Sequence, residues 1–94
     1  MAKAIFNGKV IADSDQTESV EGNTYFPPES LTRENFSETD HTTFCGWKGT
    51  ANYYSITVEG ETAENVAWTY KDPKEEAAHI KEFVAFYPAV KIES

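Results

Sequence analysis

Short apolar runs separated by turn-forming residues recur along the whole chain. Residues 2–6 and 9–13 form the first two runs, and Asn7 and Gly8 lie between them. An Asn-Gly pair between two apolar runs is the strongest local signal of a β-hairpin, because both turn positions require a positive φ. The same pattern of runs and breaks predicts further strands at residues 20–21, 24–26, 42–45, 51–58, 66–70, 83–87 and 90–92. Short strands at this spacing predict a mainly antiparallel β domain.

The segments between these runs carry weaker or different signals. Residues 30–36 alternate only weakly and fit a strand poorly, whereas residues 37–41 are polar and predict a turn. The only predicted helix covers residues 74–81. Asp72 is a favoured N-cap for it, and Pro73 suits the first helical position. We therefore expect one short helix beside a set of antiparallel strands.

Length and charge narrow the class of protein. The 94 residues predict one domain spanning residues 1–94. Aromatic residues make up 14% of the chain, enough to fill much of the core of so small a domain without disulfides. The net charge of −8 argues against nucleic acids and membranes as partners, because phosphate backbones and anionic lipids would repel the chain.

The cysteine and histidine content adds expectations about compartment and cofactors. A single cysteine cannot form an internal disulfide, which favours a reducing compartment. No apolar run is long enough for a signal peptide or a spanning helix, so we expect a cytoplasmic protein. Two histidines and one cysteine lack the paired spacing of a zinc site, and we expect neither a metal nor a cofactor. A monomer and a homodimer both remain open.

The candidate chemistry is concentrated in residues 42–54, which predict a strand, a glycine-bounded loop and a second strand. This stretch holds the only cysteine, Cys45, together with Trp47, Lys48 and Tyr53. Loops held between strands commonly carry binding groups. We therefore expect any functional site to include this loop.

Cys45 and Lys48 each have two interpretations. Cys45 is either a nucleophile or redox thiol activated by the nearby lysine, or a small buried side chain that closes the strand. Lys48 lies between Trp47 and Gly49 in a run that otherwise has a half-buried pattern. Its ammonium either meets a phosphate or carboxylate of a ligand, or reaches water while its carbon chain lies along Trp47.

Aromatic residues on the predicted strands form a second candidate feature. Trp68 and Tyr70 are two positions apart and so project to the same face of a predicted strand. The other aromatic residues, Tyr53, Phe86 and Tyr87, lie on other predicted strands. Such a group either walls a ligand pocket with its polar tips turned inward, or simply fills the core.

The motifs that contain these residues resemble a known family, the bacterial and fungal proteins called domain of unknown function 427. The resemblance extends over nearly the whole chain and rests on four segments in order: residues 25–27 (Tyr-Phe-Pro), 45–53 (Cys-Gly-Trp-Lys-Gly-Thr-Ala-Asn-Tyr), 67–70 (Ala-Trp-Thr-Tyr) with Pro73, and 85–87 (Ala-Phe-Tyr). Gly46 departs from the family pattern, which has proline at that place.

The resemblance implies a β-tent, a folded pair of antiparallel sheets shared with Rab-accessory zinc proteins and methionine sulfoxide reductase B. The zinc-binding cysteine pairs common in that fold are absent here. Parts of the family carry the label nucleotidyltransferase. This chain has no phosphate-binding loop and no metal-binding carboxylate pair at a strand end, so we do not adopt that label.

Three functions follow from these alternatives. The first is a domain that binds a small molecule, with an anion as one option, in an aromatic pocket around Cys45 and Lys48. Its further ligand-binding residues are Trp47, Tyr53, Trp68, Tyr70 and Tyr87. The second is a transferase-like enzyme in which Cys45 is the nucleophile or redox thiol and Lys48 steers the substrate. The third is a protein-interaction module whose aromatic residues only fill the core.

Overall fold

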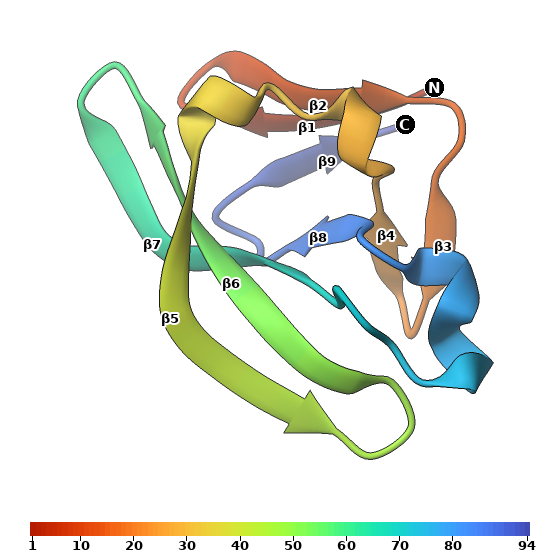
Figure 1. The fold of residues 1–94 in the computed structure, drawn as a ribbon. Coiled ribbons are helices and arrows are strands. Elements are labelled where there is room, and N and C mark those ends of the chain that lie inside the picture. Colours follow the sequence, from red (N-terminus) through yellow and green to blue (C-terminus); the bar gives the residue numbers. More distant parts are fainter.

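The computed structural model describes all residues, 1–94, and consists almost entirely of β-strands and their connections (Figure 1). Nine strands follow one another along the chain: β1 (Ala2–Phe6), β2 (Lys9–Ser14), β3 (Glu18–Val20), β4 (Asn23–Tyr25), β5 (Phe36–Cys45), β6 (Gly49–Val58), β7 (Glu61–Thr69), β8 (Val84–Phe86) and β9 (Lys91–Glu93). Three short 3-10 helices lie between strands: η1 (Pro28–Ser30), η2 (Arg33–Asn35) and η3 (Glu75–Ile80). None of these helical segments is long and apolar enough to cross a membrane.

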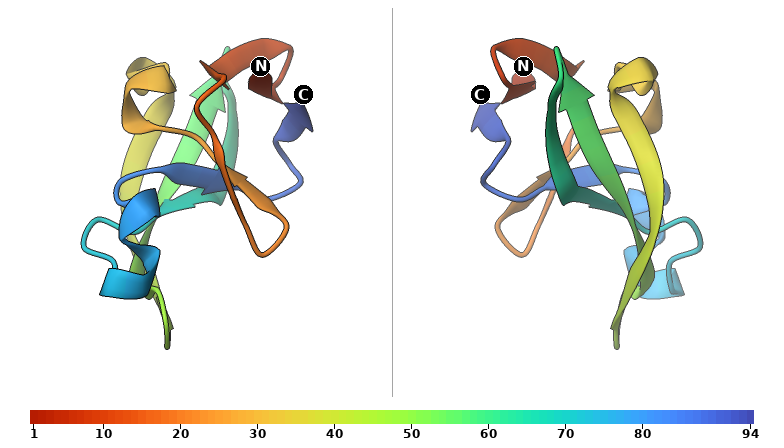
Figure 2. Two further views of the ribbon diagram at one scale, coloured as in Figure 1. Left: turned by 90° about the vertical axis from the view of Figure 1, so that its right-hand side faces the viewer. Right: turned by 90° about the vertical axis from the view of Figure 1, so that its left-hand side faces the viewer.

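The strands form three antiparallel sheets. β2, β1 and β9 make the first sheet, β3 and β4 the second, and β5, β6, β7 and β8 the third, each in that spatial order. A bridge between Phe26 and Val84 joins the end of β4 to β8. The first sheet lies at one end of the long β5–β6 hairpin, and the loop that joins β5 to β6 extends beyond the opposite end (Figure 2). The prediction of a mainly antiparallel β domain of folded sheets is confirmed.

The hairpin predicted from Asn7 and Gly8 is present, and β1 pairs with β2. Asn7 and Gly8 have φ values of 49° and 78°, as a two-residue hairpin turn requires. The strands predicted at residues 20–21 and 24–26 imply a turn at Gly22 and Asn23, which is wrong by one residue. Glu21 and Gly22 form the turn between β3 and β4, with φ values of 55° and 80°, and Asn23 begins β4.

Two predictions for the segment before the central loop are wrong. Residues 30–36 hold the end of η1 and all of η2 instead of a weak strand. Residues 37–41 belong to β5 instead of a turn, and an irregularity in the β5–β6 register lies between Glu38 and Thr42. β5 is the outer strand of its sheet and mostly exposed, so its polar residues face water while its backbone pairs with β6.

The predicted helix at residues 74–81 is present as the 3-10 helix η3, with a break in helical geometry at Ala77. The N-cap position is Lys74, without a side-chain cap, so the prediction of Asp72 as N-cap is wrong. The Lys74 N–H donates instead to the Lys48 carbonyl at 2.9 Å. This bond fastens the start of η3 to the β5–β6 loop.

Two apolar clusters form the core. The first lies mainly between the β1–β2–β9 sheet and the third sheet, and includes Ile11, Phe26 and Ile56. The second lies between the third sheet, β3–β4 and η3, and contains Val20, Tyr25, Ala51, Tyr53, Trp68, Tyr70, Ala77, Ile80 and Ala85. Cys45 packs against this second cluster. The candidate residues are therefore concentrated around one of the two cores.

Candidate functional site

The β5–β6 loop turns Lys48 inward. Lys48 is only 6% exposed, and its ammonium forms an ion pair with Glu21 from the β3–β4 turn. Lys48 Nζ also lies 5.4 Å from the ring centroids of Trp47 and Tyr70, within the range of a cation–π contact. The Trp47 indole N–H donates to the second Glu21 carboxylate oxygen at 3.3 Å. A ligand that used Lys48 would have to displace Glu21.

The charges of this pair stabilise each other. Burial opposes the charged form of Lys48, but the hydrogen bond to Glu21 and the nearby Tyr25 and Tyr70 oxygens outweigh it and raise the pKa of Lys48. Hydrogen bonds from Lys48 and Trp47 lower the pKa of the Glu21 carboxyl below its ordinary value of 4.5. Lys48 is therefore a cation, and Glu21 an anion, throughout the neutral range.

Cys45 is half-buried and free, at the end of β5 where it pairs with Gly49. Its thiol makes no side-chain hydrogen bond, and Cys45 lines neither of the two pockets. Burial raises the pKa of the nearby Tyr70, with Lys48 acting in the opposite direction. The loop thus brings a thiol, an ammonium and a phenol into one region without enclosing a hollow around them.

The larger of the two pockets, which we call the aromatic pocket, lies next to this region and has a volume of about 620 Å³. Its lining comes from the β3–β4 turn, β4, β7, and the segment from β8 to β9: Gly22, Asn23, Thr24, Trp68, Phe86, Tyr87, Pro88, Val90, Lys91 and Ile92. Lys91 is its only charged residue. The lining of the pocket is largely apolar, and its polar side chains, Asn23, Thr24 and Lys91, belong to β4 and β9.

The aromatic rings of this pocket are linked to hydroxyl groups that lie behind them. Trp68 and Tyr87 lie with ring centroids 4.7 Å apart, and the Tyr87 hydroxyl is 3.5 Å from the Tyr53 hydroxyl. Tyr53 in turn shares a 3.0 Å hydrogen bond with the hydroxyl of Thr43. The bond to Tyr53, followed by burial, raises the pKa of Tyr87. Behind Trp68, its indole N–H donates to the Tyr25 hydroxyl at 3.1 Å.

The structure divides the predicted site residues into two groups. Trp68, Phe86 and Tyr87 line the aromatic pocket, and Tyr53 stacks against Tyr87 behind it. The other group is Cys45, Trp47, Lys48 and Tyr70, which lie around the Lys48–Glu21 ion pair. The two groups meet in the second core cluster, which contains Tyr53 and Trp68 of the first group and Tyr70 of the second, but they do not surround one common pocket.

Sequence reasoning missed Glu21 and the pocket residues Asn23, Thr24 and Lys91. Glu21 precedes Lys48 by 27 positions and belongs to a different sheet, so no local spacing connects the two residues. The one available signal was charge: a lysine inside a half-buried run needs a counter-charge. No cluster of three or more His, Cys, Asp or Glu side chains is arranged to hold a metal ion.

Comparisons with known proteins agree with the motifs. A search of curated proteins found no match. The family model described as domain of unknown function (DUF427) matches residues 1–94, which is the whole chain. The four motifs lie on β4, on the β5–β6 hairpin, on β7 and on β8, and therefore include the ion pair's lysine and most of the aromatic wall. The chain belongs to the DUF427 family.

Proposed function

We propose that this domain binds a small molecule with a flat or apolar ring and an anionic group, and that the ligand occupies the aromatic pocket. The observation that carries this proposal is the pocket itself. Its volume of about 620 Å³ falls in the range that accommodates small ligands, and its lining is mainly apolar with a few polar groups.

The exposed apolar surface of the pocket supports this proposal. Tyr87 is 45% exposed, and Ile92 is exposed as well, although both adjoin the buried Trp68 and Val90. Folding alone gains nothing from leaving a tyrosine ring and an isoleucine side by side in water. A ligand ring stacked beside Trp68 and Tyr87 would bury this surface.

The charge of the pocket indicates which ligands to test. Lys91 is the only charged residue of the lining, and Asn23 and Thr24 offer further polar groups. Lys91 also pairs with Glu93 at 3.1 Å, but both side chains are largely exposed, so the pair can open at little cost. An anionic group is therefore the natural partner for this side of the pocket.

The test uses the two indole N–H signals of the protein. AMP, glucose 6-phosphate and 4-hydroxybenzoate are titrated in turn into ¹⁵N-labelled protein while its NMR spectrum is followed. Binding in the aromatic pocket moves the Trp68 indole signal and saturates, while the Trp47 signal stays in place. The probe that binds also raises the melting temperature, by mass action.

Two variants complete this test. Tyr87→Ala removes an exposed ring from the pocket and abolishes the shift, whereas Phe44→Ala removes an exposed ring at the far end of β5 and leaves it intact. A shift of the Trp47 signal alone would show that the ligand binds at the Cys45–Lys48 loop and not in the aromatic pocket. If none of the three probes shifts Trp68, the proposed ligand class is wrong.

A further inference from the structure

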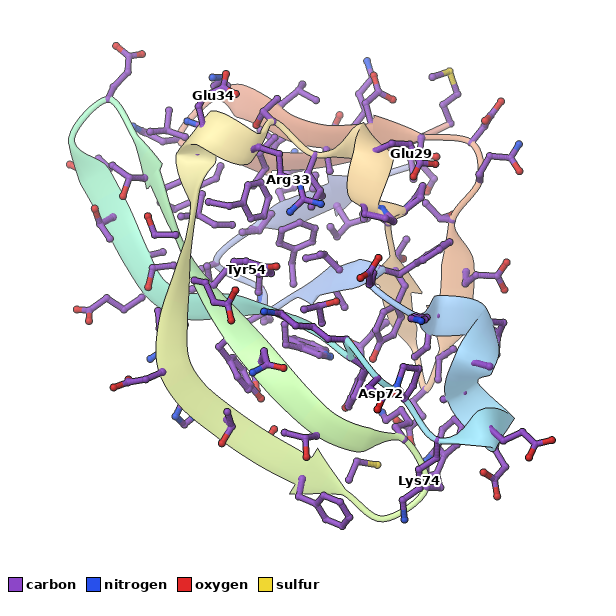
Figure 3. The ribbon with its side chains drawn as sticks, in the orientation of Figure 1. Glu29, Arg33, Glu34, Tyr54, Asp72 and Lys74 are labelled. Atoms are coloured by element: carbon purple, nitrogen blue, oxygen red, sulfur yellow. The ribbon has the colours of Figure 1, made fainter.

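A second pocket, of about 330 Å³, has a different character from the aromatic pocket and shares no residue with it. We call it the polar pocket. It is lined by Arg33, Glu38, Tyr54, Thr69, Lys71 and Glu82. These residues come from η2, β5, β6, β7 and the segment between β7 and β8, which holds Lys71 and Glu82, so five separate parts of the chain converge there. In Figure 3, Arg33 and Tyr54 both extend into the space between β5 and β8.

Thr69 carries an unpartnered polar atom in this pocket. Its side chain is 1% exposed, and its hydroxyl is the only buried side-chain polar atom of the protein without a hydrogen-bond partner. Thr69 follows Trp68 on β7, and successive strand residues project to opposite faces. Burying a hydroxyl without a partner is costly, so such an atom calls for an explanation.

The four charged side chains of the polar pocket are not paired equally. Lys71 donates to both Glu38 carboxylate oxygens, at 2.7 and 2.6 Å, so these two charges compensate each other. Arg33 pairs with no carboxylate, and its one hydrogen bond is a 3.4 Å contact to the Pro28 carbonyl. Glu82 takes part in no ion pair. The pocket therefore presents one uncompensated positive group and one uncompensated negative group.

The neutral donors complete the arrangement. The Tyr54 hydroxyl makes no hydrogen bond within the protein, and its ring is held edge-on by Phe36, with centroids 5.8 Å apart. Tyr54 and Thr69 hydroxyls together with the Arg33 guanidinium are donors suited to a carboxylate, which accepts several hydrogen bonds at once. Glu82 is the corresponding acceptor for an ammonium group.

We propose that the polar pocket binds a small zwitterion of the α-amino acid type, with its carboxylate on Arg33, Tyr54 and Thr69 and its ammonium on Glu82. A simple anion would leave Glu82 without a partner, and a simple cation would leave Arg33 without one. Only a ligand with both charges matches the pocket. The volume of about 330 Å³ suits a molecule of this size. This site is independent of the ligand proposed for the aromatic pocket.

The test titrates glycine and L-serine into ¹⁵N-labelled protein, with glycolate and methylammonium as controls that carry one charge each. The two zwitterions give saturable shifts at the Thr69 amide, and the single-charge controls bind at least about tenfold more weakly, because each lacks one charge-assisted contact. Absence of saturable shifts with glycine and L-serine overturns the proposal. Equal binding of glycolate overturns it as well.

Variants separate a binding role from a structural one. Arg33 is exposed, so Arg33→Gln keeps the fold and should lose zwitterion binding. Thr69→Val removes the buried hydroxyl at nearly constant shape. It should raise the melting temperature of the free protein and yet weaken zwitterion binding about tenfold. A merely structural hydroxyl would not produce these opposite signs.

Two controls keep this result distinct from the aromatic pocket. Thr50→Val changes an exposed threonine of β6 outside both pockets. It should alter neither the melting temperature nor the affinity for the zwitterions. Tyr87→Ala disrupts the aromatic pocket and should leave zwitterion binding unchanged. If Thr69→Val or Arg33→Gln binds glycine and L-serine with unaltered affinity, the assignment of this pocket fails, whatever the outcome for the aromatic pocket.

Discussion

Replacing Lys48 by methionine and by alanine separates the charge of this buried lysine from the packing of its carbon chain. The Lys48 side chain is buried between Trp47 and Tyr70, whereas the Glu21 carboxylate that pairs with it is about 50% exposed. When the ammonium is removed, Glu21 can be hydrated where it stands. No such compensation is available when the carbon chain of Lys48 is removed, because its loss leaves a void beside the Trp47 and Tyr70 rings.

The magnitudes favour packing over charge. Lys48→Ala removes roughly three buried methylene groups at about 0.8 kcal/mol each, which gives a loss of about 2.4 kcal/mol. Lys48→Met keeps a chain of similar length. It loses an ion pair with a half-exposed partner, worth about 0.2–1 kcal/mol. It also loses two cation–π contacts of about 0.5–1 kcal/mol each. Against these losses, it relieves the desolvation of the ammonium and gains sulfur–aromatic contacts of about 0.3–1.5 kcal/mol.

We therefore expect Lys48→Ala to lower the free energy of unfolding by about 2–3 kcal/mol and Lys48→Met to change it by no more than about 1 kcal/mol. Urea denaturation followed by circular dichroism measures both values. For a domain of this length, each kcal/mol corresponds to a change of about 4–8 °C in melting temperature. Glu21→Gln, which leaves the ammonium buried without its counter-charge, should be more destabilising than Lys48→Met. If methionine destabilises the domain as much as alanine, the charge rather than the carbon chain holds this loop, and the reasoning is refuted.

Three further predictions concern the hairpin turns and the buried tryptophan. The folded pKa of Glu21 lies below its ordinary value of 4.5. The contribution of Glu21 to stability is therefore present above that value and is lost as the pH falls through the folded pKa. Between pH 6 and about 3, the free energy of unfolding should decline less steeply for Glu21→Gln than for the wild type. Tyr25→Phe removes the acceptor of the buried Trp68 indole N–H and should cost about 1–3 kcal/mol in thermal unfolding; an unchanged melting temperature would contradict the importance of that bond. Glu59 has a φ of 49° in an exposed turn, so Glu59→Asn should stabilise the domain by about 0.5 kcal/mol, a part of the roughly 1–3 kcal/mol of strain at such positions; a lower melting temperature would show that the glutamate side chain has another role.

The strands that contain short apolar runs could be predicted from the sequence, and the polar part of β5 could not. β1 and β2 are marked by two apolar runs and by the Asn-Gly turn between them, whose φ values are dictated locally. β5 carries neither signal in residues 37–41, because it is an edge strand with most side chains in water. Its conformation is imposed by pairing with β6. Backbone pairing leaves no apolar pattern in an edge strand whose side chains face water.

The same distinction applies to the candidate site. The motif at residues 45–53 identified the loop, and the strand spacing identified Trp68 and Tyr87. The two interpretations of Lys48 were a ligand anchor and a lysine with its head in water. The structure shows a third arrangement, in which the ammonium is buried against Glu21. That outcome depends on how two sheets meet, which no local pattern encodes.

Glu21 connects the ion pair to the proposed ligand site. In three hairpin turns, a residue with positive φ precedes a glycine: Asn7, Glu21 and Glu59. Asparagine tolerates this conformation better than most other residues. Glutamate at position 21 is less suited to it, but its carboxylate accepts hydrogen bonds from both Lys48 and Trp47. The ion pair thus holds the β3–β4 turn against the β5–β6 loop, and the three residues that follow Glu21, residues 22–24, form one side of the aromatic pocket. Lys48, which touches none of the pocket, therefore acts on it by fixing the position of that side. Under the proposed function, Lys48 would thus support ligand binding without contacting the ligand.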